Sequence, residues 1–124
     1  MRIDATDPSS LAAYGAEVIR LLCSGRIDTV ANRFGYSLAH GREPAVAIRE
    51  DLGRCLTELK ATSLATSLNH AAPTVKYFEP NDTRLVAVVE CLARADNGSN
   101  VLVELIVQGD EHGKHTALED ISAA

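Results

Sequence analysis

The last third of the chain has the pattern of an antiparallel β-sheet in which apolar residues are barely interrupted. Two strand-like runs, 85–95 and 101–108, flank the sequence Asp96-Asn97-Gly98-Ser99. An Asn-Gly pair between two such runs is a strong local signal for a β-hairpin. A second turn over 109–113 leads into a third run over 114–121. The pattern therefore predicts three consecutive antiparallel strands.

The register of the first hairpin determines which side chains share a face of the sheet. If Asn97-Gly98 is a two-residue turn, Arg94 pairs with Val101, and Glu90 and Glu104 lie on opposite faces. One predicted face then carries Val86, Val88, Glu90, Leu92, Val101, Val103, Leu105 and Val107, and the other carries Leu85, Ala87, Val89, Cys91, Ala93, Leu102, Glu104 and Ile106. A sheet with one face in water alternates apolar with polar residues, and neither predicted face does so. We therefore expect each face to be covered.

The first half of the chain has apolar residues at helical spacing. Asp7 followed by Pro8 predicts a helix start, and the helix should run to about Ser24. A short second helix is predicted over 27–34, and a third from near Pro44 to about residue 60. These assignments predict three helices before the sheet.

The segments between these elements give weaker signals. Residues 36–41, which are flanked by glycines, are predicted to form a short strand or an extended connection. Residues 63–70 fit either a helix end or a strand, and residues 74–79 alternate as a strand does. Three helices followed by a curved antiparallel sheet of about four strands predict an α+β fold. A length of 124 residues predicts a single domain over 1–124.

Composition excludes some classes of function. The net charge of −5 argues against a nucleic-acid-binding groove, which needs clustered Lys and Arg. No apolar run is long enough to span a bilayer and the N-terminus has no signal-peptide pattern, so we expect a cytoplasmic protein that does not bind membranes. Cys23, Cys55 and Cys91 lie in apolar runs without metal-ligand spacing, which favours reduced core cysteines.

The order of the elements and the residues at their junctions resemble the NTF2-like superfamily. The matching segments are Gly25-Arg26-Ile27-Asp28, residues 30–34, residues 41–49, Gly113-Lys114 and Leu118-Glu119-Asp120-Ile121. The superfamily includes ketosteroid isomerase and the SnoaL-type polyketide cyclases. The resemblance implies a cone in which helices close one side of a curved sheet around an apolar pocket. It also implies a homodimer through the other sheet face and no cofactor.

The catalytic residues of the isomerases do not carry over to this chain. The stretch between Phe34 and Gly41 is shorter than in the isomerases and lacks their catalytic aspartate. Val18 stands where they have the oxyanion tyrosine, and Tyr14 lies one helical turn earlier. Their second acid falls near Glu104 or the next residue.

Two glutamates interrupt apolar strands and are the first candidates for chemistry. A carboxylate in an apolar setting is costly unless it is paired, and burial raises its pKa. Glu90 or Glu104 is therefore a candidate general acid or ligand-orienting group in a pocket. The alternative is a glutamate that reaches water or pairs with Arg94 or Lys114.

Three further side chains are candidates for lining a pocket. His40 is a candidate acid or base, although a loop histidine that caps the backbone fits the sequence better. Tyr14 and Tyr36 are candidate hydrogen-bond donors, but such tyrosines more often bury the ring and send the hydroxyl to water. His112 and His115 lack the spacing of a helical metal-binding pair, so we expect no metal.

Two functions remain open at this stage. The first is the binding of a small apolar molecule in the cone, with the possibility of a cofactor-free isomerase, cyclase or dehydratase. The second is a non-catalytic homodimerisation or partner-binding domain whose interior is filled by its own side chains.

Overall fold

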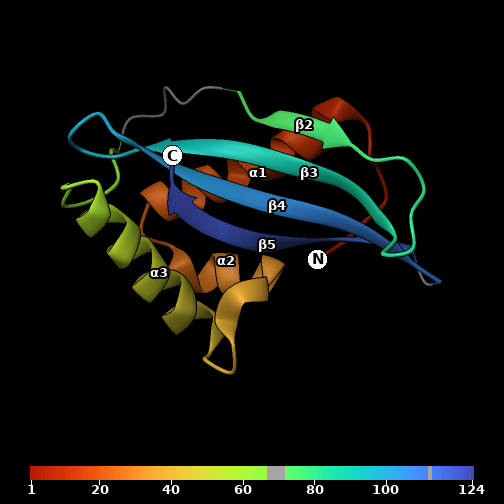
Figure 1. Cartoon of the computed structure of the whole chain (residues 1–124), viewed down its shortest axis with the longest axis horizontal. Helices are drawn as coiled ribbons and strands as arrows, with labels where there is room; N and C mark the ends of the chain where they lie inside the picture. The colour runs from red at the N-terminus through yellow and green to blue at the C-terminus, as the bar shows by residue number, and fades with distance from the viewer. Residues whose placement is uncertain (67–71, 112) are drawn as a thin grey trace.

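A computed structural model describes residues 1–66, 72–111 and 113–124, and it confirms the predicted α+β fold. The helices are α1 (Pro8–Cys23), α2 (Ile27–Phe34) and α3 (Pro44–Glu58), with a short 3-10 helix, η1 (Ser37–Ala39), before α3. The strands are β1 (Arg2–Ile3), β2 (Thr74–Tyr77), β3 (Leu85–Arg94), β4 (Asn100–Asp110) and β5 (Gly113–Ala123). They form one antiparallel sheet in the order β1-β5-β4-β3-β2 (Figure 1).

The helices begin where the sequence predicts them. The Asp7 side chain accepts a hydrogen bond from the backbone N–H of Ser10 at 3.1 Å, which caps the start of α1, and Pro8 occupies the first turn. The bounds of α2 agree with the prediction, and α3 ends two residues before the predicted residue 60.

The prediction for the segment between α2 and α3 was wrong. Residues 36–41 are not extended, because Ser37–Ala39 turn as a 3-10 helix. Arg42 stabilises this turn by donating hydrogen bonds to the carbonyl oxygens of Leu38 and Ala39, both at 2.8 Å. The sheet also contains a fifth strand that was not predicted, β1, which pairs with β5. In the ambiguous segment 63–70, Leu64 forms an isolated bridge with Ala95, while residues 67–70 lie outside the described residues.

The register of the β3–β4 hairpin differs by one residue from the prediction. The Ala95 N–H donates to the carbonyl of Ser99 at 2.7 Å, and Gly98 adopts a left-handed φ of 86°. The turn therefore has three residues and ends on a glycine, a common hairpin type. Arg94 pairs with Asn100 instead of Val101.

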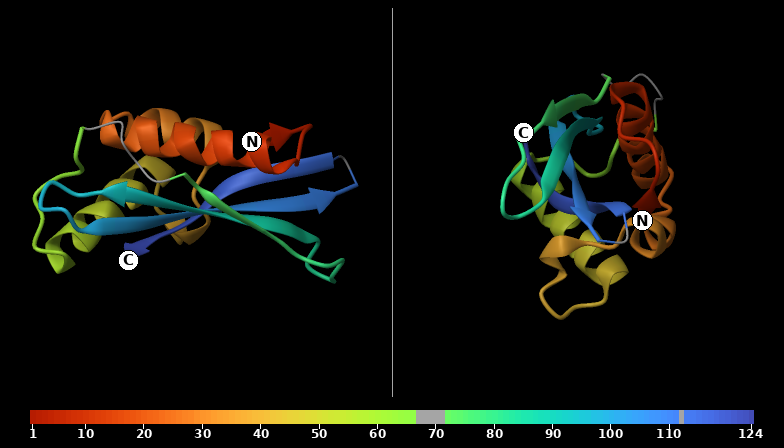
Figure 2. Two further views of the ribbon diagram at one scale, coloured as in Figure 1. Left: turned by 90° about the horizontal axis from the view of Figure 1, so that it is seen from above. Right: turned by 90° about the vertical axis from the view of Figure 1, so that its right-hand side faces the viewer.

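This shift changes which side chains share a face. The helix-covered face of the hairpin, called the inner face below, contains only apolar residues with exposed fractions of at most 1%: Ala87, Val89, Cys91, Ala93, Val101, Val103, Leu105 and Val107. In Figure 2, left, α1 lies along this side of the sheet. Glu90 and Glu104 pair directly on the opposite face, so the prediction that they face opposite sides was wrong.

Helix α1 packs directly against β3 at Gly15. A Cβ atom at this position would lie 2.6 Å from Cys91 Sγ, 3.0 Å from Val89 Cγ1 and 3.2 Å from Pro73 Cγ. These distances are too short for ordinary contacts, so the glycine is what allows the close approach. At this point side chains fill the space between α1 and the sheet.

Candidate functional site: the outer face of the sheet

The face of the sheet that points away from the helices is the best candidate for a functional surface. We call its central part the outer face, and this part carries Thr74, Lys76, Val88, Glu90, Leu92, Leu102, Glu104, Ile106, Ala117, Asp120 and Ser122. The same alternation places the polar residues Arg94, Asn100, Gln108 and His115 at its two ends. The residues of this central part on β3, β4 and β5 are half-buried except Leu92, which is 37% exposed. Apolar side chains thus remain accessible along the middle of the molecule.

Three carboxylates form a row across the outer face. Glu104 on β4 pairs with Glu90 on β3 and with Asp120 on β5. Lys76 Nζ lies 2.5 Å from Glu90 Oε1. Among the described residues, no hydrogen bond or ion pair engages Glu104 itself. The centre of the face therefore holds a carboxylate between two others.

The surroundings of Glu104 affect its ionisation. Burial raises the pKa of Glu104, and the carboxylates of Asp120, Glu90 and Glu119 raise it further, whereas Lys76 lowers it. Like charges directly opposite each other on a sheet also destabilise the pairing of its strands. This row is thus electrostatically unfavourable in the isolated chain.

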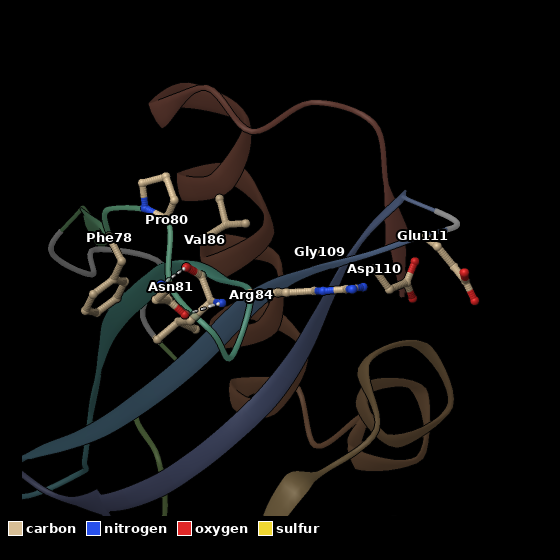
Figure 3. A pocket seen from close by; sticks show the side chains of 9 residues that line it. Phe78, Pro80, Asn81, Arg84, Val86, Gly109, Asp110 and Glu111 are labelled. Carbon is tan, nitrogen blue, oxygen red and sulfur yellow. Dashed lines mark hydrogen bonds between the residues drawn. The ribbon is translucent and has the colours of Figure 1, made fainter.

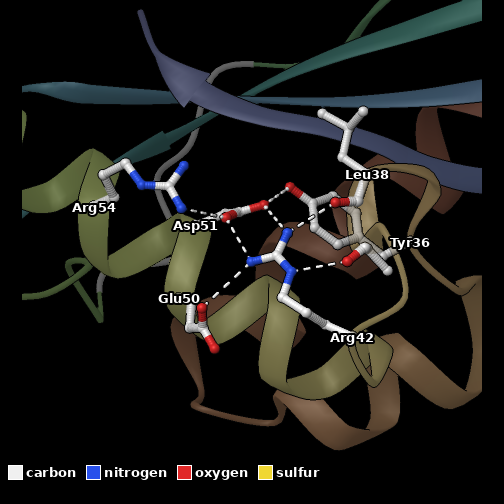
Figure 4. A network of polar contacts seen from close by, with 7 residues as sticks. Tyr36, Leu38, Arg42, Glu50, Asp51 and Arg54 are labelled. Atoms are coloured by element: carbon white, nitrogen blue, oxygen red, sulfur yellow. Dashed lines mark hydrogen bonds and ion pairs between the residues drawn. The ribbon is translucent and has the colours of Figure 1, made fainter.

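A second polar cluster lies between η1 and α3 and is centred on the buried Asp51 (Figure 4). Tyr36 Oη donates to Asp51 Oδ2 at 2.6 Å, and Arg54 Nη2 donates to Oδ1 at 2.9 Å. Arg42 donates to both oxygens, from Nη1 to Oδ1 at 3.2 Å and from Nη2 to Oδ2 at 3.3 Å. Four donors therefore occupy this carboxylate.

Asp51 and Tyr36 are each held in one protonation state. Burial alone would raise the pKa of Asp51, but hydrogen bonds from Arg42 and Tyr36 outweigh it, and the pKa lies below its ordinary value. Burial and the hydrogen bond to Asp51 raise the pKa of Tyr36 well above its ordinary value. An ionised, fully bonded aspartate does not serve as a general base, and the tyrosine proton is already donated. The cluster ties η1 to α3 and is structural.

The structure does not bring the five predicted site residues together. Glu90 and Glu104 lie on the outer face, away from the helices. Tyr36 belongs to the Asp51 cluster. Tyr14 is half-buried on α1 and packs against the core, and His40 is exposed in a left-handed turn with φ 52°.

The sequence analysis did not identify Asp51 as a candidate. Its exposed fraction is only 8%. The available signal was its position, since Asp51 follows Ile48 by three residues and directly precedes Leu52, both on the apolar stripe of α3.

The cysteines lie where the sequence predicts them. Cys55 and Cys91 are buried, Cys23 is half-buried, and none forms a disulfide. Burial raises the pKa of all three thiols, that of Cys91 to about 12, which makes them poor nucleophiles.

Within residues 1–66, 72–111 and 113–124, no group of three His, Cys, Asp or Glu side chains is arranged to hold a metal ion. No helix in these ranges is long and apolar enough to cross a membrane.

Comparison with known proteins gives no relative from which a function could be transferred. No family model, no curated protein and no solved structure matches the chain. The resemblance to the NTF2-like superfamily therefore stays a prediction.

Proposed function

We propose that this chain is a non-catalytic, NTF2-like domain that associates with a second copy of itself through the outer face of its sheet. The observation that carries the proposal is the exposure of apolar side chains, with Leu92 the most accessible, along a face that no described helix covers.

The size of this face agrees with the proposal. Four strands about 4.8 Å apart and about nine residues long span roughly 600 Å² in projection. Stable interfaces bury about 800 Å² per partner, and corrugated side chains add to the projected area. The area of the outer face is therefore similar to the area that each partner buries in a stable dimer.

The acidic row restricts how two copies can pack. A two-fold axis that passes through Glu104 would place the row of one copy against the row of the other. If the second copy is instead shifted by two residues along the strands, about 7 Å, the acidic row of one copy approaches Lys76 of the other. We therefore expect an offset dimer in which this lysine lies near both rows.

Binding of a small apolar molecule inside the cone has less support. The inner face is filled by apolar side chains, and α1 closes on β3 at Gly15. A ligand there would have to separate α1 from the sheet. An isomerase, cyclase or dehydratase also needs convergent polar groups, and of the five candidates only Glu90 and Glu104 lie together, on the outer face.

Size-exclusion chromatography with light scattering tests the proposal. At micromolar concentrations we expect the mass of a dimer. Leu92→Glu places a charge next to the acidic row and should weaken association by about 30-fold, which corresponds to ~2 kcal/mol.

The matched control is Val46→Glu on α3, because Val46 is 40% exposed and lies away from the outer face. This variant should remain dimeric, and both variants should keep the circular dichroism spectrum of the wild type. A monomeric wild type at these concentrations, or equal weakening by both substitutions, would overturn the proposal.

A further inference from the structure

A hollow of about 630 Å³ lies at the end of the sheet that is remote from α3, between the β2–β3 connection and the end of β4 (Figures 1 and 3). Its lining residues are Phe78, Pro80, Asn81, Arg84, Leu85, Val86, Gly109, Asp110 and Glu111. Four of these are apolar residues on the β2–β3 side, and Phe78 is 46% exposed. The volume is within the range of small-molecule sites. None of its lining residues belongs to the outer face as defined above or to the Asp51 cluster.

Gly109 keeps one wall of the hollow open. A Cβ atom at this position would have no heavy atom within 4 Å, and the residue is not among those with positive φ. Neither crowding nor backbone conformation therefore requires a glycine in this strand. A glycine in a strand often marks close approach by another group, which here would be a ligand.

The opposite wall is held rigidly. The Asn81 side chain donates from Nδ2 to the carbonyls of Glu79 and Leu85, at 2.8 and 2.9 Å. Its Oδ1 accepts from Thr83 Oγ1 at 2.6 Å and from the Leu85 N–H at 3.1 Å. With its side chain fully bonded, Asn81 fixes the loop that carries Arg84. The site is thus largely preformed.

Arg84 is the unusual residue of this loop. Its φ is 56°, a left-handed conformation that is strained for a residue such as arginine. The Gly109 N–H donates to its carbonyl at 2.9 Å, which holds the backbone in place. Among the described residues, no hydrogen bond or ion pair engages its guanidinium, and Figure 3 shows the side chain reaching across the hollow toward Asp110. A strained, well-held arginine with free donors is suited to binding an anion.

The acids on the far wall restrict the charge of that anion. Asp110 Oδ2 accepts from His115 Nε2 at 2.8 Å, which directs this carboxylate toward β5. Asp110 and Glu111 together oppose a second negative charge in the hollow. A monoanion is therefore favoured over a phosphate dianion, and the apolar wall around Phe78 favours an aromatic or aliphatic body.

We infer that this hollow is a binding site for a small monocarboxylate with an apolar body. Its carboxylate binds the Arg84 guanidinium in a bidentate manner, and its body packs on Phe78, Pro80 and Val86. The site is independent of the proposed dimer.

Titration with naphthalene-2-carboxylate, followed by amide chemical shifts and by calorimetry, tests this inference. We expect shifts confined to residues 78–86 and 109–111. Naphthalene-2-carboxamide, which has nearly the same shape without the charge, should bind at least tenfold more weakly. Arg84→Asn should weaken binding of the carboxylate to the same extent, because asparagine tolerates the left-handed backbone but lacks the cation. Arg84→Lys should retain part of the affinity.

Arg26→Asn is the matched control, since Arg26 is exposed and lies far from the hollow along the chain. It removes the same charge and should leave the affinity unchanged. Three results would each overturn the inference: equal binding of acid and amide, equal effects of the two asparagine variants, or shifts outside the hollow. Binding of inorganic phosphate as tight as that of the carboxylate would contradict the choice of a monoanion.

Discussion

The two faces of the β3–β4 hairpin are formed by alternate residues of the same two strands, yet they obey different constraints. On the inner face every side chain is apolar and almost completely buried. On the outer face apolar residues such as Leu102 and Ile106 alternate with Glu90 and Glu104 and remain half-buried. The inner face is selected for packing against α1. If the proposed dimer forms, the outer face has to stay soluble in the isolated chain and also offer apolar area to a partner.

Substitutions at neighbouring positions of β4 measure this difference most directly. Leu105 is completely buried on the inner face, so Leu105→Ala should lower the free energy of unfolding by about 3 kcal/mol. Ile106 is half-buried on the outer face, and Ile106→Ala should cost about 1 kcal/mol or less. Urea unfolding, at concentrations where the midpoint does not depend on protein concentration, gives both values. Equal losses would mean that the two faces are equally well packed.

The contact between α1 and β3 gives a second, smaller effect. In Gly15→Ala the new methyl group would lie 2.6 Å from Cys91 Sγ, and such overpacking costs about 1–3 kcal/mol. Alanine gains about 1 kcal/mol in helix propensity, so we expect a net loss of about 1 kcal/mol.

Gly53→Ala is the control for this substitution. Gly53 is an exposed residue of α3, and a Cβ atom there meets nothing within 4 Å. This variant should be more stable than the wild type by about 0.5–1 kcal/mol. Thermal unfolding gives the sign of each change. A stabilising Gly15→Ala would mean that the inner face has room for a ligand beside α1.

The sequence predicted most elements of the fold because their signals are local. The Asp7-Pro8 pair and the apolar spacing of α1 and α3 lie within single helices. The prediction of the hairpin register was wrong because an Asn-Gly pair fits turns of two or of three residues. Only the position of Gly98 in the folded turn distinguishes these two turn types. A one-residue shift transfers every side chain of one strand to the other face. The register of the three-residue turn places all eight apolar residues of the inner face on the same side of the hairpin. Burial of apolar residues was therefore the signal that favoured this register.

The site was harder to predict because its contacts are not local. Asp51 is buried by Tyr36 and Arg42, which lie on other segments, so no pattern within α3 identifies its partners. Glu104 looked like a candidate for a pocket because it interrupts an apolar strand. Only the correct register shows that it meets Glu90 and Asp120 on the outer face.

The smallest expected effect concerns the charge of Glu104 on this outer face. Because burial and neighbouring carboxylates raise its pKa above the ordinary 4.5, the folded chain binds this proton more tightly than the unfolded chain does. The stability that the protonated group contributes is complete below pH 4.5 and is lost as the pH rises through the raised pKa. Glu104→Gln mimics the protonated form. It should match the wild type below pH 4.5 and exceed its free energy of unfolding at pH 7 by up to about 1 kcal/mol.

Urea unfolding of both proteins between pH 4 and pH 8 measures this difference. Glu43→Gln is the control, since Glu43 is exposed at the start of α3 and lies outside the acidic row. Its difference from the wild type should stay small and should not follow the same pH dependence. If Glu104→Gln were instead less stable than the wild type at pH 7, the ionised carboxylate would have to be bound by a cation. Lys76 of the same chain already lies against Glu90, so this result would indicate that the cation comes from a second copy across the outer face.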